Sequence, residues 1–94
     1  MLGMKILKEI TSQTHFSAYF EDNGEIFAAD LILIVLGGLA FTKCMIFKAH
    51  KTNRTESGYA ATNLNELYSA KDIPFTRDSL LACIKEFCRV TDGD

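Results

Sequence analysis

Alternating hydrophobic and polar residues near the start of the chain predict a β-hairpin. Phe16, Ala18 and Phe20 alternate with more polar neighbours, and apolar residues resume after a turn at residues 23–24. A period of two places successive side chains on opposite faces of a strand. The turn reads Asn-Gly, which is favoured in tight hairpins because both central residues need a positive φ. We therefore expect two antiparallel strands over residues 14–28.

Residues 26–47 form the most apolar stretch of the chain, and two structures fit it. A membrane-spanning helix would run about 22 residues, just enough for a hydrocarbon core of about 30 Å. Asp30 and Lys43 leave only residues 31–42 free of charge, about 18 Å of helix, and a charge inside lipid costs several kcal/mol. Two buried strands joined at Gly37-Gly38 explain the β-branched residues and the glycine pair without lipid. We therefore expect a second hairpin and no membrane partner.

The N-terminal segment is compatible with two secondary structures. In residues 1–13, Leu2, Ile6 and Ile10 fit one face of a short helix. Ile6 and Ile10 also lie, with Met4, on one side of a possible strand, because their positions in the sequence differ by even numbers. We favour the strand.

A polar loop and an ambiguous segment follow the second hairpin. Residues 51–58 are polar and end in glycine, which is typical of an exposed connection. Beyond them, Asn63 with Glu66 three residues later resembles a helix start. A strand beginning at Tyr59 fits residues 59–72 equally well, and both alternatives stay open.

The last segment has the clearest helical pattern. Thr76 follows Pro74 as a candidate N-cap, and Asp78 lies in the first turn. Apolar residues then recur at helical spacing, namely Leu80, Leu81, Ile84, Phe87 and Cys88. An amphipathic helix needs another element to cover its apolar side, and the apolar sheet is available. The predicted fold class is α+β, with a small antiparallel β-sheet of about four strands and the C-terminal amphipathic helix packed on one face.

The second face of the predicted sheet also carries apolar side chains. Ile32 and Ile34 point away from the face that holds Leu31, Leu33 and Val35. One helix covers only one face. We therefore expect residues 1–13 and 59–72, or another copy of the chain, to cover the other, which makes a homodimer the expected assembly.

Length and composition indicate one small domain over residues 1–94. A hydrophobic share of 48% and a charged share of 23% are typical of a globular chain and argue against disorder. The three cysteines, Cys44, Cys83 and Cys88, are an odd number, and the last two point about 140° apart on the predicted helix. The sequence shows neither a disulfide framework nor the pattern of an N-terminal signal peptide. The cysteines are therefore typical of buried thiols in a reducing compartment, and we expect a cytoplasmic protein.

The charge distribution argues against nucleic acid as the main partner. The net charge is −2, whereas phosphate-binding domains are usually basic. Four bases nevertheless follow one another with no acid between them: Lys43, Lys48, Lys51 and Arg54. This stretch is a candidate surface for phosphates or an acidic partner protein, although such a run more often forms a solvated face.

Candidate chemistry is sparse. The two histidines, His15 and His50, lie far from each other and from any cysteine pair, so we expect no metal, no cofactor and no catalytic cluster. Asp30 is the charged residue inside the apolar run, and it would contact a ligand if His50 or Tyr59 reached the same pocket. We expect Asp30 instead at a strand end or a bulge, or capping a neighbouring backbone group.

The acids of the first turn have a simpler explanation than chemistry. Glu21, Asp22 and Glu25 crowd the Asn-Gly turn and fit solvated turn residues better than an acid-base pair.

These observations favour a non-enzymatic binding or interaction module that associates with itself. Its partner would be a protein or a small apolar ligand held between sheet and helix. Two alternatives stay open: a small enzyme or ligand-sensing domain that uses Asp30, and a weak nucleic-acid binder that uses the basic residues 43–54.

Overall fold

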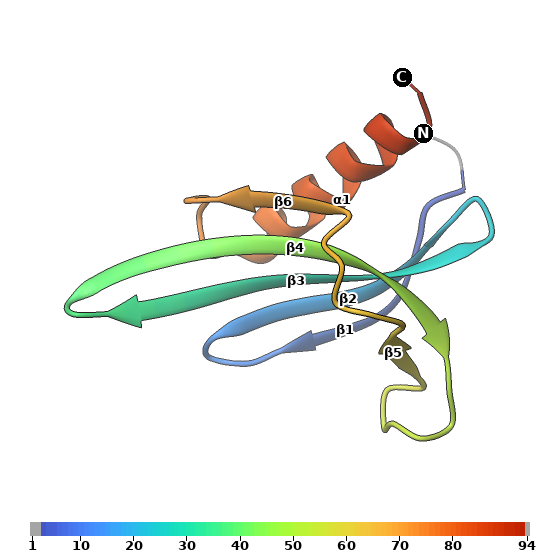
Figure 1. Ribbon diagram of the computed structural model, residues 1–94, viewed down its shortest axis with the longest axis horizontal. Coiled ribbons are helices and arrows are strands. Elements are labelled where there is room, and N and C mark those ends of the chain that lie inside the picture. Colours follow the sequence, from blue (N-terminus) through green and yellow to red (C-terminus); the bar gives the residue numbers. More distant parts are fainter. Residues whose placement is uncertain (1–2, 94) are drawn as a thin grey trace.

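The computed structural model describes residues 3–93, in which a curled antiparallel sheet carries one helix across one face (Figure 1). Strands follow in the order β1-β2-β3-β4, and β4 also pairs with both β5 and β6. The fold class is therefore α+β, as predicted. The elements are β1 (Lys5–Thr11), β2 (His15–Asp22), β3 (Glu25–Leu36), β4 (Leu39–Lys51), β5 (Tyr59–Ala61), β6 (Tyr68–Lys71) and α1 (Arg77–Thr91).

Both predicted hairpins are present. Asn23 and Gly24 adopt φ values of 53° and 79°, and Gly37 and Gly38 adopt 55° and 81°, as the tight turns require. Residues 26–47 therefore form most of the β3–β4 hairpin, and the alternative of one continuous helix is wrong. Within the described residues, no helix has the length and hydrophobicity needed to cross a bilayer.

The sheet has six strands in the described residues, whereas the sequence predicted about four. The N-terminal segment forms β1, so the strand prediction is confirmed and the helical one is wrong; Leu2 lies outside the described residues. A strand begins at Tyr59, and no helix begins at Asn63. The Asn63 side chain instead accepts a hydrogen bond from the backbone N–H of Asn65 at 3.0 Å, which is typical of a turn. β5 and β6 have only three and four residues, so any alternation in them is a weak signal in the sequence.

The predicted C-terminal helix is confirmed together with its N-cap. Thr76 is extended, and its hydroxyl accepts a hydrogen bond from the backbone N–H of Ser79 at 3.1 Å. The first helical residue, Arg77, holds the helix to β1 through two hydrogen bonds to the Glu9 carboxylate, at 2.6 and 2.8 Å.

The core lies between α1 and the face of the sheet that we call the helix face. An aromatic cluster forms its centre: the ring of Phe87 from α1 lies 5.0 Å from that of Phe27 and 6.1 Å from that of Phe20. Small Ala18 and Ala29 on the sheet leave room for these rings. The buried hydrophobic cluster comprises Ala18, Phe20, Phe27, Ala29, Leu31, Cys44, Ile46, Leu80, Cys83, Ile84, Phe87 and Cys88.

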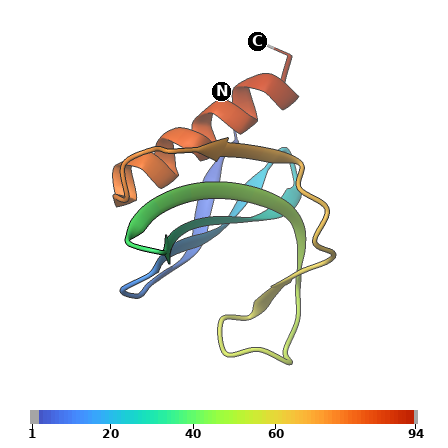
Figure 2. The same cartoon turned by 60° about the vertical axis from the view of Figure 1, so that its left-hand side comes forward.

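The opposite side of the sheet, which we call the open face, has no helix on it in the described residues. The predicted cover is largely absent, because β1 and β6 extend the sheet at its edges rather than crossing this face. The far end of β4 curls away from α1 and carries β5 with it (Figure 2). This curl stacks Tyr59 on Tyr19 at 5.3 Å and closes one end of the open face. The side chains that the central strands β3 and β4 contribute to the open face are Ala28, Asp30, Ile32, Ile34, Phe41, Lys43, Met45 and Phe47.

Truncation of the central aromatic residue tests this core. We expect Phe87→Ala to lower the free energy of unfolding by about 3–5 kcal/mol, because it removes a buried ring and leaves a cavity. Val90, on the same helix but 56% exposed, provides the control, since Val90→Ala should change stability by no more than about 0.5 kcal/mol. Urea denaturation followed by circular dichroism measures both, and equal losses would contradict the assignment of the core.

Candidate functional site

Asp30 lies in the middle of β3 on the open face. Its neighbours in register are Ser17 of β2 and Met45 of β4, and the ladders are unbroken on both sides. The expectation of a strand end or bulge is therefore wrong. The sequence suggested an end because a carboxylate is costly inside an apolar strand, but a neighbour removes that cost: Ser17 Oγ donates a hydrogen bond to Asp30 Oδ1 at 2.7 Å.

Asp30 lines a cavity of about 210 Å³ at the curled end of the open face. The hollow exists because alanines stand where larger residues would fill the space. Its walls are Ser17, Ala18, Tyr19, Ala28, Ala29, Asp30, Phe47, Ala61 and Leu64. One carboxylate in an otherwise mostly apolar cavity can orient a small ligand by accepting a hydrogen bond.

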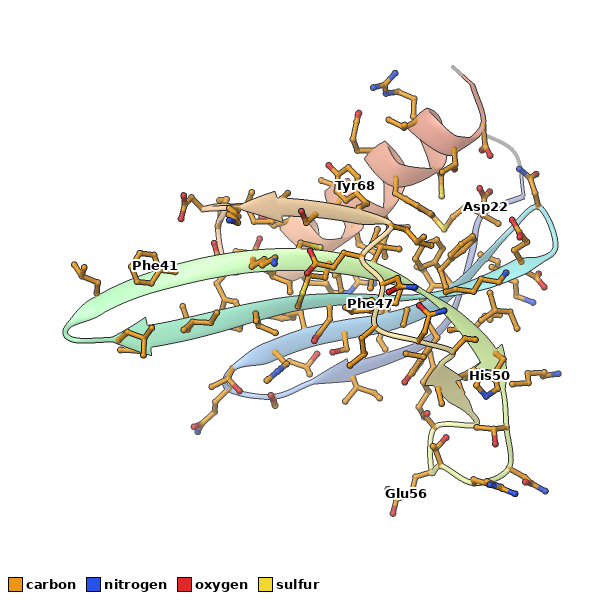
Figure 3. All side chains as sticks on the ribbon, in the orientation of Figure 1. Asp22, Phe41, Phe47, His50, Glu56 and Tyr68 are labelled. Atoms are coloured by element: carbon orange, nitrogen blue, oxygen red, sulfur yellow. The ribbon has the colours of Figure 1, made fainter. Side chains whose placement is uncertain are left out.

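The three ligand-binding residues predicted from the sequence are only partly brought together. Tyr59 stacks on Tyr19, which lines the Asp30 cavity, so Tyr59 reaches the margin of this site. His50 does not: it is exposed on the other side of the β4–β5 ribbon, where its Nδ1 lies 2.9 Å from Thr62 Oγ1 (Figure 3). Successive side chains of a strand point to opposite faces. Lys51 pairs with Tyr59 and shares its face, so the neighbouring His50 points to the opposite face.

The cavity offers little for catalysis. Among the described residues that line it, the ionisable groups are Asp30 and the phenol of Tyr19. Nucleophilic or acid-base catalysis usually needs a nucleophile or base within hydrogen-bond reach of its partner. Residues 3–93 also contain no group of three or more histidines, cysteines and carboxylates placed to hold a metal ion.

The four basic residues 43–54 are distributed over both sides of the sheet. Lys43 is on the open face and pairs with Glu66 at 3.1 Å, while Lys48 is on the helix face and pairs with Glu25 at 3.3 Å. Lys51 ends β4, and Arg54 lies in the exposed loop beyond it. Alternation along β4 therefore separates charges that are near neighbours in sequence.

The cysteines are reduced and buried, as the sequence suggested. Burial raises the pKa of Cys44 far above its usual value and that of Cys88 to about 12. The pKa of Cys83 is also raised by burial, although a hydrogen bond with Cys44 lowers it. Since the thiolate is the reactive form, these groups belong to the core and not to a nucleophilic site.

A second cavity, of about 320 Å³, lies between β6 and α1. It is mostly apolar, and its lining residues are Tyr68, Ala70, Ile73, Pro74, Ser79, Ala82 and Cys83. This is the position between sheet and helix where a small apolar ligand was expected.

Sequence reasoning missed one buried carboxylate. Asp22 was assigned to a solvated turn, but it is only 3% exposed and lies beneath the C-terminal part of α1 (Figure 3). Its Oδ1 has no hydrogen-bond partner within the part of the chain that the structure describes. The alternation of Phe16, Ala18 and Phe20 could have revealed this position, because Asp22 is the next residue on the same face.

The surroundings of Asp22 disfavour its charged form. Burial raises the pKa of the Asp22 carboxyl, and the neighbouring carboxylate of Asp92 raises it further, while a hydrogen bond with Cys88 acts in the opposite direction. Asp92 is held in place by Asn23, whose Nδ2 donates to Asp92 Oδ1 at 2.7 Å.

The raised pKa of Asp22 predicts a specific dependence of stability on pH. Because the folded protein binds this proton more tightly than the unfolded chain, stability falls as pH rises from the usual aspartate value, about 3.9, through the raised folded pKa. We expect Asp22→Asn to remove this fall and to raise the free energy of unfolding at pH 7 by about 1–3 kcal/mol. Denaturation at pH 3.5 and pH 7 measures the difference, which should shrink at the lower pH.

The matched control is Asp72→Asn. Asp72 is exposed and has a φ of 57°, a conformation that asparagine tolerates well. A loss of stability at pH 7 in Asp22→Asn would contradict the assignment.

Comparison of the chain with protein-family models, curated proteins and solved structures finds no match.

Proposed function

We propose that this chain is a non-enzymatic binding module that associates with a second copy of itself through the open face. The observation that supports it most directly is an apolar arm, residues 34–41, which consists of the ends of β3 and β4 and their turn. It projects beyond the rest of the sheet (Figure 1).

The arm lacks the support that the rest of the sheet has. β2 pairs with β3 only as far as Ile32, and β6 pairs with β4 only from Lys43 onwards. An isolated two-stranded ribbon is at best marginally stable in water. This one is also strongly apolar: on its open-face side Leu36 is 64% exposed, and Leu39 and Phe41 are exposed as well, while Val35, also 64% exposed, points to the opposite side. Contiguous exposed apolar surface of this kind marks an interaction site.

The arm and the Asp30 cavity lie at opposite ends of the open face, which favours a second copy as the occupant. The projecting arm lies at one end of β3, the Asp30 cavity lies towards the other, and Ile32 lies between them. A two-fold axis near Ile32 would place the arm of each copy over the cavity of the other. Such a dimer uses the same patch twice and closes, so the open face is not left free to recruit further copies.

Size and charge are compatible with this dimer. A standard interface takes about 800 Å² from each partner, which is about one seventh of the 5844 Å² accessible surface of this chain. Residues 31–42 carry no charge, so two arms would approach without repulsion between like charges.

Charge insertion on the arm tests the proposal. At about 100 µM, we expect light scattering to give twice the 10.5 kDa chain mass for the unaltered protein. Phe41→Lys should bring the mass close to 10.5 kDa, because loss of a buried aromatic contact costs about 2–4 kcal/mol, or about 30- to 1000-fold in Kd.

Val90→Lys is the matched control. It introduces the same charge at an exposed apolar residue, but on α1 and away from the open face. A monomer for the unaltered protein at this concentration, or equal dissociation of both variants, would contradict self-association.

A small, mostly apolar ligand with one hydrogen-bond donor is the second candidate, since the Asp30 cavity combines apolar walls with a single carboxylate. Ligand and arm would occupy the same volume, so this candidate predicts that the ligand weakens self-association. Nucleic-acid binding through Lys43, Lys48, Lys51 and Arg54 has less support, since two of these bases face opposite sides of the sheet and already pair with acids.

A further inference from the structure

A third cavity lies on the helix face, between the β2–β3 turn and the last turn of α1. Its volume is about 490 Å³, within the range of sites that enclose small molecules. Its lining residues are Asp22, Asn23, Glu25, Phe27, Lys48, Leu67, Phe87, Thr91 and Asp92. The cavity therefore combines aromatic walls with a concentration of acids.

The balance of charge in this cavity is negative. Three carboxylates, those of Asp22, Glu25 and Asp92, line it together with one ammonium, that of Lys48. Asp22 is almost completely buried and has an oxygen without a hydrogen-bond partner in the described residues. A buried acceptor without a donor costs about 1–3 kcal/mol, so a donor that reaches it would be stabilised.

Lys48 shows how this cavity holds a cation. Its Nζ lies 4.9 Å from the centroid of the Phe27 ring and 3.3 Å from Glu25 Oε1. An ammonium over an aromatic face and beside a carboxylate is stabilised by both the ring quadrupole and the opposite charge. The same cavity is also lined by the Phe87 ring, which packs against Phe27, and by Asp22, whose Oδ1 has no hydrogen-bond partner in the described residues.

We propose that this cavity binds a small organic ammonium compound with an apolar body. The ammonium would donate hydrogen bonds to Asp22 and Asp92, and the apolar body would lie against Phe27, Phe87 and Leu67. The carboxylates disfavour an anionic ligand. A bare metal ion fits poorly, because the described residues include no set of three or more groups placed to ligate one.

This inference is independent of the proposed self-association. The arm and the Asp30 cavity lie on the open face, whereas the ammonium cavity lies on the helix face, beside the core. Failure of either proposal leaves the other unaffected, because one is measured as mass and the other as ligand binding.

Titration with three matched probes tests the proposal. 2-Phenylethylammonium, 2-phenylethanol and phenylacetate share an aromatic body and differ in charge, and each would be added to ¹⁵N-labelled protein. We expect the ammonium probe to shift the backbone resonances of Asn23, Phe27 and Thr91, with an affinity at least about 10-fold above that of the neutral and anionic probes. Equal affinity for the neutral probe, or shifts confined to other residues, would overturn the proposal.

Two variants separate the role of Asp22 from general effects of charge. Asp22→Asn keeps the shape of the side chain and should weaken binding of the ammonium probe by about 10-fold or more, whereas Asp72→Asn, outside this cavity, should bind like the unaltered protein. The unfolding midpoint of each variant establishes that it is folded. Unchanged affinity in Asp22→Asn would overturn the assignment of this carboxylate.

Discussion

Burial of one apolar side of α1 against the helix face is the interaction on which the rest of this structure depends. Phe87 packs against both Phe20 of β2 and Phe27 of β3, so a single helical residue contacts both strands of the first hairpin. The Glu9–Arg77 pair links the start of the helix to β1. Neither contact is local in sequence, and without the packed helix the apolar helix face would be left in water.

This arrangement also explains why the two faces differ. The helix is 15 residues long and covers the central part of one face, so apolar side chains on the other face stay half-buried and those on the projecting arm stay exposed. Asp30 and Asp22 are carboxylates on opposite faces of the sheet: Asp30 lies in the middle of β3, Asp22 lies at the end of β2, and each lines a hollow. They differ in their partners, since Ser17 supplies a donor to Asp30, whereas Oδ1 of Asp22 has none in the described residues.

Local chemistry made the hairpins and the helix predictable. Asn23-Gly24 and Gly37-Gly38 permit the positive φ that their turns adopt, and Thr76 caps the helix as its hydroxyl suggested. What the sequence did not reveal depends on contacts between distant residues. β5 and β6 exist because β4 offers them a pairing edge, and His50 points away from Asp30 because β4 alternates as it curls. The burial of Asp22 was predictable from the alternation along β2, but its charge and its position beside a turn suggested that it would be exposed to solvent.

Successive residues of β3 and β4 face opposite sides of the sheet, so neighbouring residues are selected for different surroundings. Leu31 and Cys44 point into the core, while their immediate neighbours Ile32 and Lys43 point to the open face. Evolution can therefore alter one surface of this ribbon while the other stays intact, as long as the register holds. β3 lies between the Asn23-Gly24 turn and the Gly37-Gly38 turn. Insertion or deletion of a single residue in β3 would move its core side chains to the open face and the reverse. The length of β3 is therefore under stronger constraint than the identity of most of its side chains.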